Sequence, residues 1–251
     1  MIDHDHTIRA FDVDLHQIAS MIEEMGRLAD GLIGDAAEAL EQRDTALAQR
    51  VIAADDRIDA LKRDIEQKAI ATIARRQPMA VDLREIVGAL RISNELERVG
   101  DLAKGVAKRV LQMTDEPAIN NALLQLGHMV QIVRFQLESV LESYTRHDVE
   151  AAMRVWHKDE EVDALNTSLF RELLTYMMEN PRNIAFCTHL IFCAKNIERI
   201  GDHATNIAET VCYIVEGRTI VEERPKADIT SGSQLPQLAT GDDAIVQGQS
   251  H

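Results

Sequence analysis

The chain has few residues that interrupt regular structure and few aromatic residues. Its 251 residues include only 12 glycines and 5 prolines, and aromatic residues make up 4% of the total. So few breakers argue against a sheet-rich or loop-rich fold, because turns between strands use glycine and proline heavily. A core with so few aromatics must be filled by leucine, isoleucine, valine, methionine and alanine, a mixture that favours packed helices.

Long apolar runs and paired cysteines are absent as well. No stretch of 18 apolar residues occurs, and the richest segment, residues 184–194, is interrupted by Thr188 and His189, so we expect no membrane-spanning helix. The first residues have neither the basic nor the apolar region of a secretory signal. The cysteines lie in apolar helical sequence without a C-x-x-C pair, which predicts buried, reduced thiols in a cytoplasmic protein; they are Cys187, Cys193 and Cys212.

Charge is strongly unbalanced. The 42 acidic residues exceed the 27 lysines and arginines, so the formal net charge is −15. Such a surface repels phosphate backbones and anionic lipid, which argues against a nucleic-acid partner and against direct membrane binding. It attracts cations and basic protein surfaces. The simpler alternative is that the acidic residues only keep the chain soluble.

Apolar residues three and four positions apart predict six long helices. Asp44 and Asp148 are suited to cap the second and the fifth of them. Helices of about 30 residues are about 45 Å long and are stable only when they pack lengthwise against one another. The predicted ranges are about 13–43, 44–76, 79–113, 118–146, 148–178 and 181–216.

The sequence contains an internal duplication. Residues 54–61 match residues 158–165, an offset of 104, and residues 97–101 match residues 198–202, an offset of 101. The predicted fold class is therefore all-α, a tandem repeat of two antiparallel three-helix bundles. We place the first unit at residues 1–116 and the second at 117–217. Residues 218–251 lose the apolar periodicity, and we expect a disordered C-terminal tail there.

Four acidic pairs with i, i+4 spacing recur at equivalent positions of the two units. This spacing puts both carboxylates on one helix face, where like charges cost a few tenths of a kcal/mol. A purely structural role gives no reason to repeat that cost four times, so the pattern favours cation binding. The pairs are Asp55 and Asp59, Glu97 and Asp101, Asp159 and Asp163, and Glu198 and Asp202.

The register of these pairs predicts two metal sites. In the second and third helix of the first unit, each acid follows an apolar seam position directly, so both pairs flank the core on the same side. If those helices are neighbours, four carboxylates converge on one groove, and the second unit builds the same groove. Oxygen ligands suit hard or borderline ions such as Mg²⁺, Mn²⁺, Ca²⁺ or iron.

Some nearby residues modify this hypothesis. Asn94, one turn before Glu97, is a possible further oxygen ligand, whereas its counterpart Lys195 is not, so the two sites should differ. His203 is a weaker candidate ligand. In the alternative interpretation the acids are solvated and are neutralised by neighbouring cations: Arg98, Arg199, Lys62 and Lys104.

Signatures of catalysis are missing. None of the nine histidines has a glutamate three residues before it, as a ferritin-like di-iron oxidase requires. No Walker loop, G-x-S-x-G or G-x-G-x-x-G occurs either. We therefore expect a regulatory protein that is not an enzyme. The alternatives are a metal-dependent hydrolase or oxidase that uses the same carboxylates, and a metal-free helical scaffold.

The duplicated motif resembles that of the PhoU family of bacterial phosphate-signalling regulators. The resemblance covers about residues 10–216 and is carried by three segments: Glu97-Arg98-Val99-Gly100-Asp101, Glu198-Arg199-Ile200-Gly201-Asp202 and Asn206-Ile207-Ala208. The sequence departs from the family in the first unit, which reads Lys104-Gly105-Val106-Ala107 where Asn-Ile-Ala is usual. The tail after Gly217 has no counterpart in the family that we identify.

The resemblance implies a fold, a cofactor and partners. It implies two three-helix bundles that hold iron, zinc, manganese or magnesium at the eight acids named above, with Asn94 less firmly included. It also implies a homodimer that exerts negative control of the phosphate-starvation (Pho) two-component response. The expected partners are the ATPase subunit of the phosphate ABC transporter and the sensor histidine kinase, through which the protein would be peripheral to the membrane.

Overall fold

The computed structural model describes residues 3–113 and 119–220, apart from the side chains of residues 3–10, Arg76 and Asp159. These residues form seven α-helices and one 3₁₀ turn, and they contain no strand. The elements are α1 (Asp3–Gln42), α2 (Thr45–Arg76), α3 (Ala80–Val110), α4 (Asn120–Arg146), α5 (Val149–Trp156), α6 (Asp159–Glu179), η1 (Pro181–Asn183) and α7 (Ile184–Glu216).

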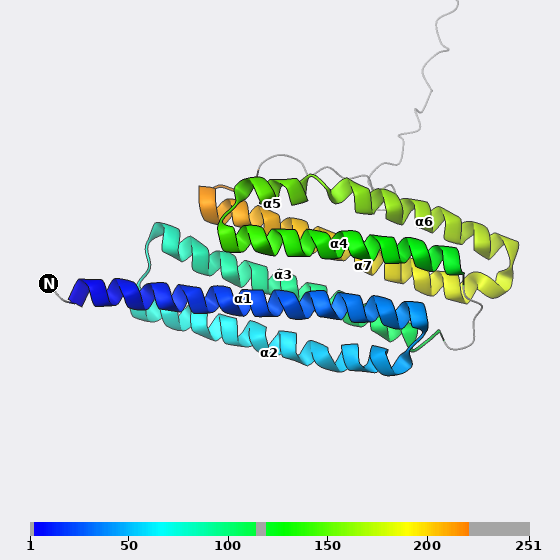
Figure 1. Ribbon diagram of the computed structural model, residues 1–251, viewed down its shortest axis with the longest axis horizontal. Coiled ribbons are helices and arrows are strands. Elements are labelled where there is room, and N and C mark those ends of the chain that lie inside the picture. Colours follow the sequence, from blue (N-terminus) through cyan, green and yellow to red (C-terminus); the bar gives the residue numbers. More distant parts are fainter. Residues whose placement is uncertain (1–2, 114–118, 221–251) are drawn as a thin grey trace, which may run out of the picture.

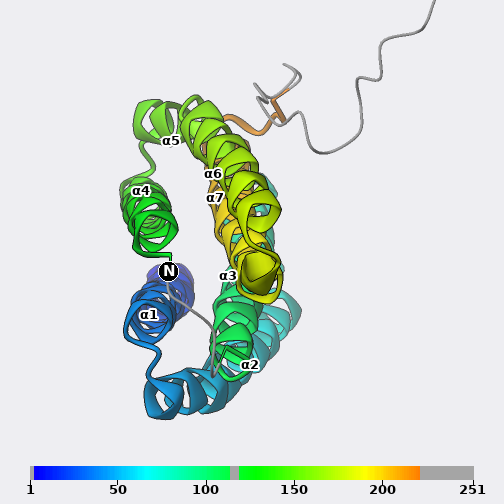
Figure 2. The same cartoon turned by 90° about the vertical axis from the view of Figure 1, so that its right-hand side faces the viewer.

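The helices pack in two layers. Helices α1 and α4 run antiparallel, side by side, and cover an arc formed by α2, α3, α7 and α6 (Figures 1 and 2). The first unit, α1 to α3, meets the second unit, α4 to α7, where α3 packs on α7 and α1 on α4. Buried apolar side chains of both units form one continuous cluster. The predicted all-α duplicated fold is confirmed.

Two predictions about the limits of the units concern residues that the structure does not describe. The junction that we place at residues 116 and 117 lies outside the described residues. The disorder predicted for residues 218–251 also concerns, beyond Ile220, residues outside the described part. Both statements stay predictions.

Two aspartates start helices, as expected. Asp44 Oδ1 accepts a hydrogen bond of 2.9 Å from the backbone N–H of Leu47, and Asp148 Oδ1 accepts one of 2.9 Å from Ala151. Each carboxylate satisfies a donor that has no partner within the helix. Helix α1 begins at Asp3, ten residues before the predicted start at residue 13.

The prediction of one helix over residues 148–178 is wrong in one respect, because the helix is interrupted between α5 and α6. At the break, the carbonyl of Lys158 accepts hydrogen bonds of 3.3 Å from the buried Gln136 side chain of α4 and from the backbone N–H of Glu161. The buried Trp156 donates to Glu209 at 3.1 Å and anchors the end of α5. The acidic residues 159–161 then form the first turn of α6, where the helix dipole favours negative charge.

The described residues bear on two expectations, that no helix spans a membrane and that the cysteines are buried. There, no helix is both long and apolar enough to cross a membrane. All three cysteines are buried. Burial raises the pKa of the Cys193 thiol to about 12, so it carries little thiolate at neutral pH.

Candidate carboxylate sites

The helices that carry the acidic pairs are neighbours in both units: α2 packs on α3, and α6 packs on α7. A glycine within each motif allows a close approach. A Cβ at Gly100 would lie 3.0 Å from Asp55 Oδ1 and 2.9 Å from Ile58 Cδ1. A Cβ at Gly201 would lie 3.3 Å from Oε1 of Gln136, so in the second unit the close neighbour at this glycine is α4 rather than α6. Only glycine therefore fits at Gly100 without displacing the side chains of α2.

Two lysines of the first site each pair with an acidic residue on the neighbouring helix. Lys104 of α3 donates from Nζ to Asp55 Oδ2 of α2 at 2.6 Å, and Asp55 is only 1% exposed. In the opposite direction, Lys62 Nζ of α2 lies 3.6 Å from Glu97 Oε1 of α3. The two pairs link α2 to α3 and neutralise one acid on each helix.

The other acids of the first site lie around the same lysine. The hydrogen bond with Asp55 raises the pKa of Lys104, burial lowers it, and the charges of Asp101 and Asp59 raise it further. Asp101 is exposed and lies 3.6 Å from Arg98 Nη1. The neutralising cations proposed for this unit, Lys62, Lys104 and Arg98, are therefore engaged. Asn94, the possible further ligand, is exposed.

The second site centres on a buried glutamate. Glu198 is 5% exposed; its Oε1 accepts a hydrogen bond of 2.8 Å from Lys195, and its buried Oε2 has no hydrogen-bond partner. Burial raises the pKa of Glu198; the Lys195 hydrogen bond lowers it, and the charges of Asp202 and Asp163 raise it. Three acids of this unit thus lie close enough to influence one another. Asp159, the fourth, begins α6, but its side chain lies outside the described part.

The second site lacks the two lysines of the first. Asn166 stands at the position equivalent to Lys62, and Thr205 at that of Lys104. Neither side chain carries a charge, so neither neutralises an acid. A hollow of about 230 Å³ between α6 and α7 is lined by Asn166 and Lys195 with apolar walls. Aligning the two units would have revealed this difference from the sequence.

These arrangements do not amount to a ready-made metal site. Among the described side chains, no three of His, Cys, Asp and Glu come together closely enough to hold an ion. The metal sites therefore stay a prediction. The unpartnered Oε2 of Glu198 fits a cation in the second unit, since a buried acceptor without a donor is costly. The equivalent Oε2 of Glu97 in the first unit also lacks a hydrogen bond, but Arg98 Nε lies 3.5 Å from it. In the first unit, the Lys104 ammonium already supplies a positive charge 2.6 Å from Asp55, where a metal ion would otherwise supply it.

A polar cluster between the units was not anticipated. His203 of α7, a candidate ligand by sequence, lies with Nδ1 2.6 Å from Glu95 Oε2 of α3, and Asn206 Nδ2 donates to the same oxygen at 3.0 Å. At the equivalent place on the other side, Asn196 donates to the carbonyl of Leu102 at 3.4 Å. These contacts join residues about 100 positions apart, and the periodicity carries no signal for them.

The fold and its sites define a class of protein: an all-helical body made by duplication, with an acidic cluster on an equivalent helix pair in each half. Comparison with known families agrees with this description. The PhoU domain matches residues 22–110 and again residues 126–211. The chain belongs to the PhoU family, as the duplicated motif had indicated.

Relatives match over nearly their whole length. The phosphate-specific transport system accessory protein PhoU homolog of Rhizobium meliloti is 52% identical over 230 residues, which cover 92% of this chain and 97% of that protein. The protein of the same description from Caulobacter vibrioides is 46% identical over 227 residues, 90% and 99% of the two chains.

Solved structures agree with the fold. The crystal structure of PhoU from Pseudomonas aeruginosa is 37% identical, with a TM-score of 0.78 over 83% of this chain and 100% of that one. The phosphate transport system regulatory protein PhoU from Streptococcus pneumoniae is 27% identical, with a TM-score of 0.78 over 84% and 99% of the two chains.

Proposed function

We propose that this chain is a regulatory accessory protein of a phosphate-specific transport system. One observation carries the proposal: 52% identity, over 97% of its length, to a protein described as such an accessory protein. In this proposal the chain acts in the cytoplasm as a homodimer. It represses the phosphate-starvation response by linking the ATPase subunit of the phosphate ABC transporter to the sensor histidine kinase. It reaches the membrane only through these partners.

A gene deletion tests this role. In phosphate-rich medium, cells without the protein should express a phosphate-starvation reporter such as alkaline phosphatase, which wild-type cells keep repressed. The full chain supplied from a plasmid should restore repression. A reporter that stays repressed in the deletion strain would exclude negative control by this chain.

We also propose that the second carboxylate site binds a divalent or trivalent metal ion, with iron, zinc, manganese and magnesium as the candidates. The buried Glu198 oxygen without a donor supports this, as does the replacement of two lysines by Asn166 and Thr205. Glu198, Asp202 and Asp163 would hold the ion, with Asp159 as the fourth acid of the motif. A bound cation would lower the cost of gathering these negative charges.

Elemental analysis of purified protein distinguishes the two sites. The double variant Glu198→Gln/Asp202→Asn should lose its metal, whereas the matched variant Glu97→Gln/Asp101→Asn should keep it, since lysines serve the first site. Equal metal content in both variants and the wild type would refute the assignment. A metal-free scaffold predicts no metal at all and the same melting temperature in EDTA.

A catalytic role for the same carboxylates is tested in parallel. A metal-dependent hydrolase or oxidase would turn over phosphoesters or peroxide, and the variant without Glu198 and Asp202 would not. For a regulatory accessory protein we expect no turnover by the metal-loaded wild type.

A further inference from the structure

Three hollows follow α1 along most of its length: two lie between α1 and α4, and the third lies at the end of α4, where α3 also lines it. The central one, of about 620 Å³, shares Gln131 and Arg134 with a hollow of about 320 Å³ toward the end of α1. On the other side it shares Glu23 and Thr145 with a hollow of about 580 Å³ near the start of α1. Because neighbouring hollows share lining residues, they form one continuous depression, which we name the α1–α4 groove.

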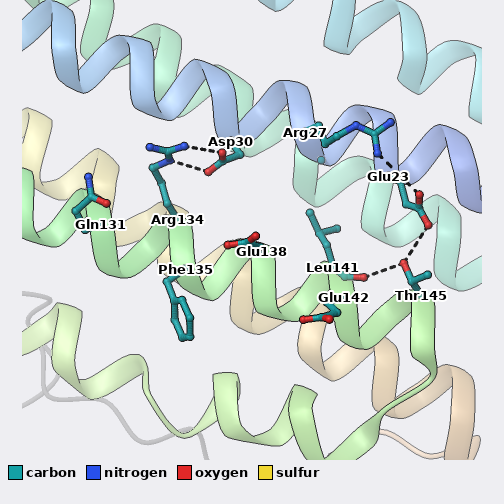
Figure 3. A pocket seen from close by; sticks show the side chains of 11 residues that line it. Glu23, Arg27, Asp30, Gln131, Arg134, Phe135, Glu138, Leu141, Glu142 and Thr145 are labelled. Carbon is teal, nitrogen blue, oxygen red and sulfur yellow. Dashed lines mark hydrogen bonds and ion pairs between the residues drawn. The ribbon is translucent and has the colours of Figure 1, made fainter.

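Fixed contacts hold the two helices together at the groove. Arg134 Nε and Nη2 of α4 donate to Asp30 Oδ1 and Oδ2 of α1, both at 2.7 Å, and Thr145 Oγ1 lies 3.2 Å from Glu23 Oε1 (Figure 3). These bonds resist separation of the walls. Apolar side chains line the three hollows: Leu15 and Leu141 are partly exposed, and Ile18, Leu40, Leu126 and Val130 are almost fully buried beneath them.

The polar lining of the groove is far more acidic than the chain as a whole. Nine acidic residues line the three hollows, against two arginines and two histidines. The whole chain has 42 acidic residues and 27 lysines and arginines. Three of these acids already have a basic partner in the lining, since Arg134 pairs with Asp30, Arg27 with Glu23 and His147 with Glu85, so six of the nine lie outside these pairs. An apolar floor between acidic rims matches the helix-in-groove mode of recognition for a helix of opposite charge.

We propose that the α1–α4 groove docks a basic amphipathic helix of a partner protein, with its apolar face inward and its lysines or arginines against the acidic rims. The groove follows α1 from Asp12 to Gln42. At 1.5 Å per residue, this length accepts a helix of up to about 30 residues. A second copy of this chain would present the same acidic face. Residues 221–251 of the chain itself contain more acidic than basic residues, so neither matches the charge of the groove.

Two glycines provide a matched pair of variants. Gly127 lines the groove, and a Cβ there would meet nothing within 4 Å, so Gly127→Leu fills the groove without displacing other atoms close to the backbone. A Cβ at the exposed Gly31 of α1 also meets nothing within 4 Å, but Gly31 lines none of the three hollows. Both changes remove a glycine from a helix interior, so neither should unfold the chain.

The binding experiment uses the purified full chain and a labelled peptide of about 28 residues, with leucine at positions a and d of four heptads and lysine on the opposite face. We expect saturable one-to-one binding by fluorescence anisotropy. A peptide of the same composition with scrambled leucines should bind at least about tenfold more weakly, as should the intact peptide to Gly127→Leu, whereas Gly31→Leu should bind like wild type. Equal binding of the scrambled peptide, or an unaffected Gly127→Leu variant, would overturn the proposal.

Charge reversal tests the rims separately. Glu38→Lys/Glu138→Lys changes two exposed acids on opposite walls, one on each helix. It should weaken binding and reduce its salt dependence between about 50 and 200 mM, because fewer charges are then paired. Unchanged affinity and salt dependence would contradict the assignment of a basic partner.

Other occupants are also tested with the full chain. Dimers in sedimentation experiments that dissociate in Gly127→Leu would make a second copy the occupant. A crosslink from residues 221–251 to the groove would make the chain's own tail the occupant. Either result overturns the proposal. The docking role rests on the proposed adaptor function, but the two fail differently: the reporter strain tests the function, and the peptide assay tests the groove.

Discussion

Replacing Lys104 with threonine, the residue at the equivalent place in the second unit, tests whether an internal cation holds the first carboxylate site. Lys104 Nζ is bound to the buried Asp55 at 2.6 Å, and Gly100 packs against the same carboxylate. The variant leaves Asp55 buried without its cation. The first site then resembles the second.

The expected cost follows from burial. Removing one partner of a fully buried ion pair destabilises a protein by about 3–5 kcal/mol. The Lys104 side chain is 24% exposed, so water reaches the pair from one side, and we expect a loss of about 2–3 kcal/mol in the free energy of unfolding. For a chain of this size, that corresponds to a fall of about 5–10 °C in Tm.

The assay is urea unfolding of wild type and Lys104→Thr in EDTA, followed by circular dichroism. Lys108→Thr is the matched control, since Lys108 is exposed and lies one turn further along α3. Manganese should restore part of the lost stability of Lys104→Thr, because Asp55 and its neighbouring acids then lack a cation. A loss below about 0.5 kcal/mol, the range of neutral surface changes, would refute the role of Lys104.

The pH dependence of this pair has a defined sign. Its hydrogen bond with Asp55 raises the pKa of Lys104 above the ordinary value of 10.5. A raised lysine pKa contributes stability that is complete below the ordinary pKa and is lost as the pH rises through the raised one. The difference between wild type and Lys104→Thr should therefore stay constant near neutral pH and shrink only in alkaline solution.

Three further predictions concern other parts of the chain. Glu198→Gln should raise the free energy of unfolding in EDTA by about 1 kcal/mol, because it removes a buried negative charge with an unpartnered oxygen, and a decrease would contradict this account. Burial by itself raises the pKa of Glu95, but the hydrogen bonds from His203 and Asn206 outweigh it and lower that pKa. Glu95 therefore contributes to the free energy of unfolding above its unfolded pKa, and this contribution is lost as the pH falls through the lowered pKa. In Glu95→Gln, the free energy of unfolding should decrease less steeply than in wild type as the pH is lowered through the acidic range. Asp148→Ala should cost about 1 kcal/mol through the lost N-cap, and urea unfolding that matches wild type would refute it.

Several features of the fold could be predicted because their physical causes are local. Apolar residues three and four apart make one helix face, so most of the predicted helix ends lie within a few residues of those in the structure. Asp44 and Asp148 cap the helices that they precede, because a cap depends only on the next three residues. The duplication could be recognised because equivalent helices of the two units have similar residues at equivalent positions.

The candidate sites were predictable only in part. The i, i+4 spacing put each acidic pair on one helix face, and the apolar seam put both helices of a unit together. Which cation meets which acid was not predictable: Lys104 lies one turn from Asp101 in sequence, yet it binds Asp55 on the neighbouring helix. That choice depends on the distance between α2 and α3, which the glycine at position 100 permits.

By itself, the sequence determined the helices, their duplication and the acidic faces, since each arises from residues within a few turns of one another. The tertiary structure decided the remainder: the break before α6, the contact of Glu95 with His203, and the groove between α1 and α4. Each of these joins segments separated by at least 20 residues. Their geometry follows from how whole helices pack, and no local pattern of residues encodes it.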